Sequence, residues 1–481
     1  MSLSIKEKLA KQERIAEKKK IADEDKNELG SGPVFYVEKL AKRHQSTYLI
    51  IVLVAAVIGY AYLLFSPVVV LTAFYFLHEL IPAANTSHDW VAIGFITLTA
   101  ILFMYSSVRT VQLKFSHVKG LKLTKEMTPD LYEVISEVHS HYKRPAIKNV
   151  VLTEKFECRI ESIPRLGIPV ASFNTLVIGL PLLQTLSPEE FRCELSRCIG
   201  QHSKIIPSLT LFVYKSRNLW DMYNVSLGKN KKFGTRPLRL FFKPYSRLYK
   251  LISAPALRME ELEADLFALE YIHDTEVFNA LKSKAISETF LNSHYWPGVR
   301  NMVMKHPNIC IKPFANLEKS IRSEAAQANR KKWLQEAYIT RHNPGDIIPG
   351  FRQRMEHMGH RKVKTIPALG MNSAEKYLGD TRKNIIPIVD KLWRSTTLSN
   401  WVKEYKEQRR DINTIKDLSR KSQKNILWPK DIICYACLAK KLRGYSMTSS
   451  VNKLMKRNLV NMTPGIISSH LQSRKITSKS V

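Results

Sequence analysis

Residues 186–201 read LSPEEFRCELSRCIGQ, and this stretch decides how the fold is interpreted. Ser187 is a good N-cap residue, because its hydroxyl accepts a hydrogen bond from a free backbone N–H of the first helical turn. Pro188 suits the first helical position, and the two glutamates that follow lie at the positive end of the helix dipole. The pattern therefore predicts a helix that starts after Ser187 and runs to the end of the stretch.

A strand is predicted immediately before this helix. Residues 174–179 read NTLVIG, a short β-prone run of the kind that forms a buried strand. A second strand is predicted over 148–153, and a helix over 127–142, where apolar residues recur at helical spacing. From about Pro255 onward the pattern is mostly helical. Together these elements predict an α+β fold that is mostly helical.

A further motif lies later in the chain, where residues 261–265 read ELEAD. The strand, the Pro-Glu-Glu helix start and this motif resemble, in order and spacing, the M48 family of membrane metallopeptidases over roughly residues 109–390. In that family the helix carries His-Glu-x-Gly-His, and the later motif is Glu-x-x-Ala-Asp. The resemblance implies a zincin-like M48 domain of the gluzincin type.

The resemblance also implies a role for individual residues of this chain. The three positions of the family's zinc ligands are occupied by Arg197, Gln201 and Glu261. Cys198 stands at the position of the general base, and Asp265 stands at the position of the acidic residue that supports the site. Of these positions, the two in the later motif keep the family's residue type.

The same resemblance implies a place for substrate. In the family an extended peptide pairs with the strand at the edge of the sheet, next to the active-site helix. The matching segment here is 174–179, so Asn174, Leu176 and Ile178 are the expected substrate-binding residues, with the cleft beside them.

The replaced residues predict that the metal chemistry is lost. A guanidinium is always protonated and offers only donors, so Arg197 cannot bind a cation. The thiol of Cys198 is a poor proton acceptor for water activation, and the neutral amide of Gln201 is a weak zinc ligand. We therefore expect no bound metal and no cofactor. Pairing of Arg197 with Glu261 would tie the two helices together without zinc.

Two alternatives use other residues of the same helix. Glu194, Cys198 and His202 recur at one-turn spacing, so they could present a displaced metal-binding face. Zinc would then be the cofactor of an active membrane endopeptidase with an altered ligand set, serving membrane-protein quality control. Alternatively, Cys198 could act as a nucleophile, with Arg197 lowering its pKa and His202 as the base.

Two apolar segments predict a transmembrane hairpin over 47–108, with spans at about 48–70 and 90–108. Each is long enough to cross a hydrocarbon layer of about 30 Å as a helix. Lys and Arg flank the hairpin on both sides and are absent from the connection between the spans, 71–89. Positively charged flanks stay inside, so both termini and the main domain are expected in the cytoplasm. We expect an integral protein of the bacterial cytoplasmic (inner) membrane.

The remaining regions are strongly basic. Lys and Arg number 75 against 42 Asp and Glu, which gives a formal net charge of +33. Residues 1–46 are expected to be a charged cytoplasmic segment, and 391–481 a basic helical C-terminal region. Such charge favours an anionic partner, and next to a bilayer that partner is an anionic lipid surface. We do not expect nucleic acid as a partner, because no nucleic-acid module accompanies the charge.

Six cysteines are scattered through the chain, which suits a reducing compartment. Cys434 and Cys437 have redox-motif spacing, but they stand in an apolar stretch and are expected on a buried helix face. The sequence thus predicts a membrane-anchored pseudopeptidase. It would bind a protein or peptide in the degenerate cleft, or regulate membrane proteins. The second alternative is a basic membrane-tethered adaptor for anionic lipid or RNA.

Overall fold

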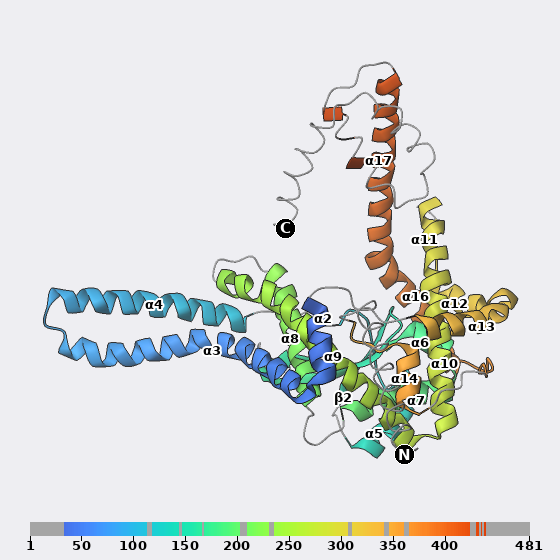
Figure 1. Cartoon of the computed structure of the whole chain (residues 1–481), viewed down its shortest axis with the longest axis horizontal. Helices are drawn as coiled ribbons and strands as arrows, with labels where there is room; N and C mark the ends of the chain where they lie inside the picture. The colour runs from blue at the N-terminus through green and yellow to red at the C-terminus, as the bar shows by residue number, and fades with distance from the viewer. Residues whose placement is uncertain are drawn as a thin grey trace, which may run out of the picture. The chain divides into compact units, whose positions relative to one another are not determined.

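The computed structural model describes residues 33–112, 118–143, 147–165, 168–202, 209–229, 235–305, 310–340, 346–359 and 365–423, and residues 430, 431, 434, 437 and 438. The described part is mostly helical with one small mixed sheet (Figure 1), so the predicted fold class is confirmed at this level. The chain divides into two compact units. One comprises Met1–Pro297 and Lys312–Trp393, and the other Gly298–Ile311 and Arg394–Val481.

The sheet has four strands in the order β1-β2-β4-β3. The short β1 (Leu121–Leu123) is antiparallel to β2 (Ile147–Thr153), which is parallel to β4 (Ile168–Gly179). β4 also pairs with β3 (Cys158–Arg165) in antiparallel register. The predicted strands at 148–153 and 174–179 are therefore present, within β2 and β4.

The predicted position of 174–179 at the edge of the sheet is wrong. This segment lies in β4, whose backbone is paired with β2 on one side and with β3 on the other. Leu176 and Ile178 are completely buried, and the Asn174 side chain accepts a hydrogen bond of 2.8 Å from Ser162. These three residues therefore cannot bind an extended substrate. The strand pattern correctly indicated burial, but it contains no information about which strands become neighbours.

The helices around the sheet start where local signals place them. α5 (Pro129–Tyr142) follows β1, and α6 (Leu180–Thr185) follows β4 directly. α7 (Pro188–Gln201) is the helix predicted from the opening stretch. Its N-cap hydroxyl accepts a hydrogen bond from the backbone N–H of Glu190, whose carboxylate in turn accepts one from the N-cap N–H.

Two long helices and a series of shorter ones complete the first unit. α8 (Leu209–Lys229) and α9 (Arg236–Tyr271) pack against each other, and α7 lies against α9 and α10 (Asp274–Phe290). The later elements of this unit are a π-helical turn (Leu291–Tyr295), α12 (Pro313–Ile321), α13 (Glu324–Ile339), α14 (Phe351–His357), α15 (Ser373–Leu378), a 3-10 turn (Gly379–Thr381) and α16 (Arg382–Trp393).

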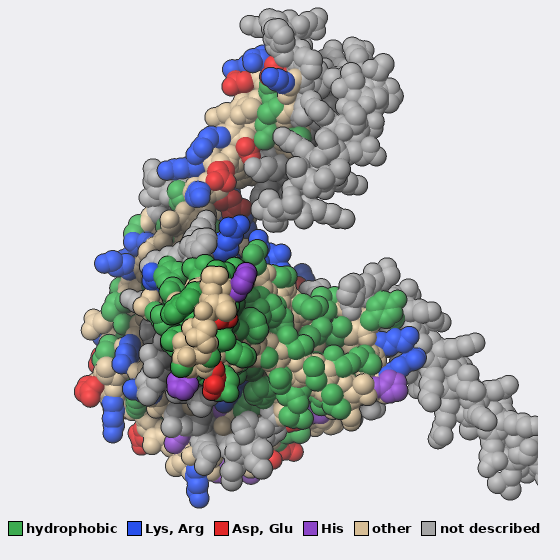
Figure 2. All heavy atoms as spheres, turned by 90° about the vertical axis from the view of Figure 1, so that its left-hand side faces the viewer, with side chains coloured by type: hydrophobic (Ala, Val, Ile, Leu, Met, Phe, Trp, Pro, Cys, Tyr) green, Lys and Arg blue, Asp and Glu red, His purple; other side chains and the backbone are tan. Residues whose placement is uncertain are grey.

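Two helices are long and apolar enough to cross a membrane. α3 (Gln45–Ala83) and α4 (Ser87–Val111) have most of their apolar side chains exposed, and Figure 2 views them from the tip of the hairpin, where hydrophobic side chains cover them. The first helix is longer than predicted, and the two are joined by only three residues. The sequence from 71 to 83 was expected in the connection, but it contains no turn signal strong enough to end the helix.

The first half of α3 belongs to a buried aromatic core. α2 (Pro33–Arg43) and α3 pack on α8 and α9, with Trp220, Tyr223, Phe242 and Tyr249 at the centre of this cluster. Trp220 stacks on Phe242 at a ring-centroid distance of 5.5 Å. Buried aromatic rings of this size contribute much of the stabilising apolar area of a core. They attach the apolar hairpin firmly to the domain that carries the site.

The second unit is described in part. It contains α11 (Trp296–Lys305), which belongs to it from Gly298 on, a π-helical turn (Arg394–Leu398) and α17 (Ser399–Gln423). Glu404 of α17 forms an ion pair of 2.7 Å with Arg300, within the same unit. Most of the expected basic region after Gln423, and the charged segment before Pro33, lie outside the described residues.

Candidate functional site

Four of the residues singled out from the sequence meet in an ionic cluster between α7, α9, α10 and α14, namely Glu194, Arg197, Glu261 and Asp265. Arg197 of α7 lies at its centre. Its guanidinium donates to Glu194 on its own helix at 3.0 Å and to Glu261 on α9 at 2.6 Å. Its Nε lies 3.8 Å from a carboxylate oxygen of Asp265. The expected pairing of Arg197 with Glu261 is therefore present.

Two cations that the sequence analysis did not identify complete the cluster. Arg354 of α14 donates two hydrogen bonds to the carboxylate of Asp265, at 2.7 and 2.9 Å. Lys284 of α10 pairs with Glu194. Three carboxylates thus face three cations, all on well-buried side chains, and the cluster is electrically balanced. We refer to Glu194, Arg197, Glu261, Asp265, Lys284 and Arg354 as the ionic cluster.

The electrostatics of the cluster keep its members charged. Burial alone would raise the pKa of Glu194, but Arg197, Lys284 and Arg354 outweigh it and hold that pKa well below its usual range. Burial opposes the charge on Arg197 as well, but the three carboxylates raise its pKa well above the ordinary value. Buried charges are tolerated when they are paired and hydrogen-bonded in this way. Glu194 and Arg197 therefore remain charged inside the cluster.

Cys198 is not placed as a nucleophile. Its side chain is buried, near the thiol of Cys158 on β3. His202 turns its Nδ1 toward the backbone carbonyl of Cys198, at 3.2 Å, and not toward the thiol. Burial lowers the pKa of His202 to about 4. A thiol without a base beside it and without solvent access has no means of attacking a substrate.

The structure brings together no metal-binding group among the residues that it describes. Glu194, Cys198 and His202, the displaced set considered from helical spacing, do not form one. The carboxylate of Glu194 is taken by Arg197 and Lys284, and the imidazole of His202 is hydrogen-bonded to its own helix. Gln201 is buried at the end of α7. A carboxylate can bind a metal ion only if it is free, but the carboxylate of Glu261 is bound to the guanidinium of Arg197.

The edge of the sheet next to α7 is β3. Within the described part of the chain β3 pairs with β4 alone, and it also contacts α7. Arg159 on this strand forms ion pairs with Glu157 at 3.0 Å and with Glu161 at 2.6 Å. The strand that can accept an added strand is thus β3, which the sequence analysis did not assign.

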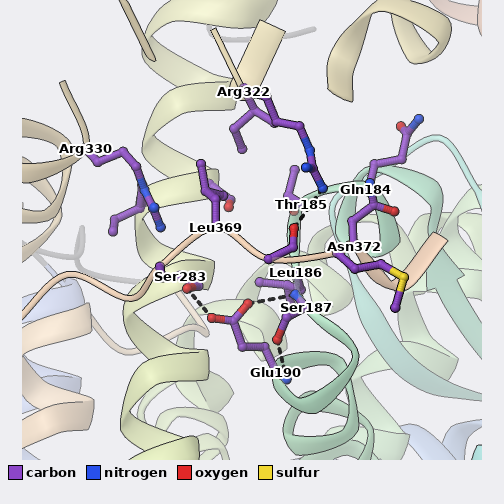
Figure 3. A pocket seen from close by; sticks show the side chains of 16 residues that line it. Gln184, Thr185, Leu186, Ser187, Glu190, Ser283, Arg322, Arg330, Leu369 and Asn372 are labelled. Carbon is purple, nitrogen blue, oxygen red and sulfur yellow. Dashed lines mark hydrogen bonds between the residues drawn. The ribbon is translucent and has the colours of Figure 1, made fainter. Parts of the chain in front are cut away.

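A small cavity lies at the N-terminal end of α7 (Figure 3). It has a volume of about 20 Å³, enough for about one water molecule. Glu190 points into it and is hydrogen-bonded to Ser283 of α10 and to the N–H of Ser187. Burial raises the pKa of Glu190, the opposite of the shift at Glu194 one turn later. The cavity is too small for a substrate, and its polar groups serve to cap the helix.

The exposure of two other cysteines differs from expectation. Cys434 and Cys437 are both exposed, so the expectation that they lie on a buried helix face is wrong. Their stretch is apolar in sequence, and apolar runs indicate burial only when another element covers them.

No family model, no curated protein and no solved structure matches this chain.

Proposed function

We propose that this chain is a membrane-anchored, metallopeptidase-like protein without catalytic activity, which acts by binding and regulating other proteins at the membrane. A single observation carries the proposal. At the position where the M48 family, which the sequence resembles, has its first zinc-binding histidine, Arg197 forms hydrogen bonds with Glu194 and Glu261. The guanidinium supplies the positive charge that a metal ion would supply, and three of its N–H groups donate to these two carboxylates.

An active zinc enzyme would require this cluster to come apart. A zinc ion at Glu261 would have to displace Arg197, whose cation would then be left close to the metal. Removing one partner from a buried ion pair costs about 3–5 kcal/mol. The general-base position would still hold Cys198, a buried thiol. These considerations favour the inactive protein over the peptidase.

The membrane anchor is supported by the exposure of the two apolar helices. Helices of a soluble core pass the same length and hydropathy test, but they are mostly buried. Here 17% of the most apolar window of α3 and 11% of that of α4 are buried. No Lys or Arg occurs from 44 to 108, whereas Lys42, Arg43 and Arg109 flank the hairpin. By the positive-inside rule the main domain faces the cytoplasm, and in a bacterial cell the membrane would be the inner one.

The edge of β3 that has no strand partner among the described residues is the surface proposed for a protein partner. A strand that adds to it would gain main-chain hydrogen bonds with little dependence on sequence. The ionic cluster lies on the helix that supports β3, and it holds α7, α9, α10 and α14 in a fixed arrangement. A rigid supporting layer of this kind favours binding over turnover.

Metal content tests the proposal. The full chain, purified in detergent, loaded with zinc and then dialysed, should contain far less than one zinc per chain by elemental analysis. The matched variant Arg197→His, Cys198→Glu, Gln201→His restores the family's residues. If the domain is zincin-like, that variant should hold about one zinc per chain. Stoichiometric zinc in the unaltered chain would refute the inactive assignment, and a folded triple variant without zinc would refute the zincin-like one.

Cross-linking in intact membranes tests the binding surface. A photoreactive side chain in place of Ser162, on the proposed binding edge of β3, should cross-link a discrete protein partner. The control position is Lys122 on β1, at the opposite edge of the same sheet. Equal cross-linking from both edges would mean that β3 has no special role.

A further inference from the structure

The α8–α9 pair runs along the first half of α3. The Tyr48 hydroxyl donates to the carbonyl of Ile252 at 2.7 Å, and the Tyr62 hydroxyl donates to the carbonyl of Pro237 at 3.2 Å. The ring of Tyr62 also stacks on that of Phe241 at a centroid distance of 3.8 Å. α9 is therefore antiparallel to α3, and it begins beside Tyr62.

The C-terminal end of α4 lies beside α3 close to Tyr62, the residue beside which α9 begins. Ser66 of α3 donates to the carbonyl of Phe103 at 2.9 Å, and its hydroxyl lies 2.8 Å from that of Ser107. Arg109 follows within one turn, so it lies near the level of Tyr62. The length of α3 beyond that level is about 30 Å at 1.5 Å per residue, which matches the hydrocarbon thickness of a bilayer.

This geometry places the start of α9 at a membrane surface. The placement rests on the proposed function, since it requires that α3 and α4 span a bilayer. Arg109 would then stand among the lipid headgroups, where a cation after a long apolar helix is expected. The beginning of α9 and the end of α8 would lie at the same depth as Arg109.

The surface of α9 at that depth is basic and apolar together. No Asp or Glu occurs from 236 to 259, and the helix exposes Leu240 and Leu248 at 68% and 59%. Because α9 is antiparallel to α3, it leads away from the hydrocarbon layer, and its cations at 239, 243 and 247 begin at the level of the headgroups. The acidic residue of α8, Asp221, is already paired with Lys250 at 2.5 Å.

A groove opens between the two helices on this surface. Its volume is about 450 Å³, and it is lined by Asn224 and Gly228 of α8 and by Arg239, Lys243 and Arg247 of α9. In the described part of the chain no carboxylate lies within ion-pair distance of these three cations. A Cβ at Gly228 would meet nothing within 4 Å, so the glycine leaves that wall of the groove open.

We propose that this groove binds the phosphate headgroup of an anionic phospholipid. Three cations that have no carboxylate partner among the described residues provide the charge, and the two arginines present paired donors that match phosphate oxygens. The Asn224 amide adds a neutral donor. The volume suits a headgroup with its glycerol.

Lipid retention measures the site directly. The full chain in detergent is titrated with phosphatidylglycerol or phosphatidylcholine, and bound lipid is counted by native mass spectrometry. We expect selective retention of phosphatidylglycerol. The variant Arg239→Gln, Lys243→Gln, Arg247→Gln should weaken that retention by at least about tenfold, given about 1 kcal/mol for each cation near an anionic surface. The control Lys319→Gln, Lys331→Gln, Lys332→Gln removes the same charge from exposed lysines of α12 and α13 and should retain the lipid.

Each other outcome overturns the inference. Equal lipid retention by the groove variant and the control would exclude the groove as the lipid-binding site. Displacement of the lipid by millimolar glycerol phosphate would assign the groove to a soluble phosphate compound, and stronger competition by a short RNA would assign it to nucleic acid. Thermal unfolding checks that the variants are folded. Alkaline extraction of membranes tests the membrane anchor independently of the lipid groove. Release of the chain would refute the anchor, whatever the groove binds.

Discussion

Arg197 of α7 donates a hydrogen bond of 2.6 Å to Glu261, a residue 64 positions later in α9. Both side chains are largely buried, at 12% and 17% exposure, so the pair is shielded from water and salt. In the M48 family, which the sequence resembles, two helices of the active site are joined through a zinc ion. In this chain an ion pair joins α7 and α9.

Replacement of this guanidinium should destabilise the protein strongly. Arg197→Met keeps the volume but leaves Glu194, Glu261 and Asp265 facing two cations, so we expect a loss of about 3–5 kcal/mol in the free energy of unfolding. Denaturant titration in detergent measures it. Lys383→Met is the control, because its pair with Asp380 is exposed, at 78% and 96%, and should contribute little to the free energy of unfolding. Equal losses would mean that the cluster is not stabilising.

A second change should restore part of that loss. Glu261→Gln added to Arg197→Met removes one of the unbalanced carboxylates, so the double variant should be more stable than Arg197→Met alone. Strictly additive losses in the same titration would show that Arg197 and Glu261 do not act on each other.

The imidazole of His202 should make stability depend on pH. Burial lowers its pKa in the folded chain to about 4, from the ordinary value of 6.5. Between these values the unfolded chain binds a proton that the folded chain excludes, so stability is complete above about 6.5 and falls as the pH drops toward 4.

Substitution should remove this dependence. His202→Gln should flatten the fall in melting temperature between pH 6.5 and 4, relative to the unaltered chain. His357 is exposed, and His357→Gln should leave the slope as it was. A slope that is unchanged in His202→Gln would mean that other groups cause the loss of stability in this range.

Thiol reactivity should follow burial. Cys158, Cys193 and Cys198 are buried, whereas Cys310 is exposed. Burial also raises the pKa of Cys193 to about 12, and its thiolate is therefore scarce at neutral pH. Brief treatment of the folded chain with iodoacetamide, followed by peptide mass spectrometry, should label Cys310 and spare the three buried thiols. Rapid labelling of Cys198 would revive the nucleophile alternative.

The sequence predicted the elements whose signals are local. The start of α7 was predicted correctly because Ser187, Pro188 and Glu190 act within one helical turn. The pairing of Arg197 with Glu261 was also anticipated, because a guanidinium at that position needs a nearby carboxylate. Both predictions depend on the properties of the residues themselves, namely helix capping and the charge of the guanidinium.

Contacts between distant segments were not predictable in the same way. Lys284 and Arg354 complete the ionic cluster from α10 and α14, and nothing local distinguishes them from the other Lys and Arg residues of this basic chain. A requirement for charge balance around three buried carboxylates would have predicted that further cations exist, but not which ones. The neighbours of β4 are likewise a matter of topology, because a strand's own sequence does not determine whether it lies inside the sheet or at its edge.

The packing of α3 on α8 and α9 leads to the last prediction. A Cβ added at Gly59 would lie 2.7 Å from Cζ2 of Trp220 and 2.9 Å from the Tyr245 hydroxyl. Trp220 is completely buried and cannot move aside. Gly59→Ala should therefore destabilise the protein, by about 1–3 kcal/mol for a small overpacking.

Gly94 of α4 provides the matched control, since a Cβ there would meet nothing within 4 Å. Both glycines lie in long apolar helices, so the gain in helix propensity from alanine is about the same for each, and the difference between the two variants reports packing alone. Thermal unfolding in detergent should show a lower melting temperature for Gly59→Ala and an equal or higher one for Gly94→Ala. Equal shifts would mean that the first half of α3 is not packed on Trp220. The alignment of α9 with the membrane surface, and with it the lipid groove, would then lose its basis.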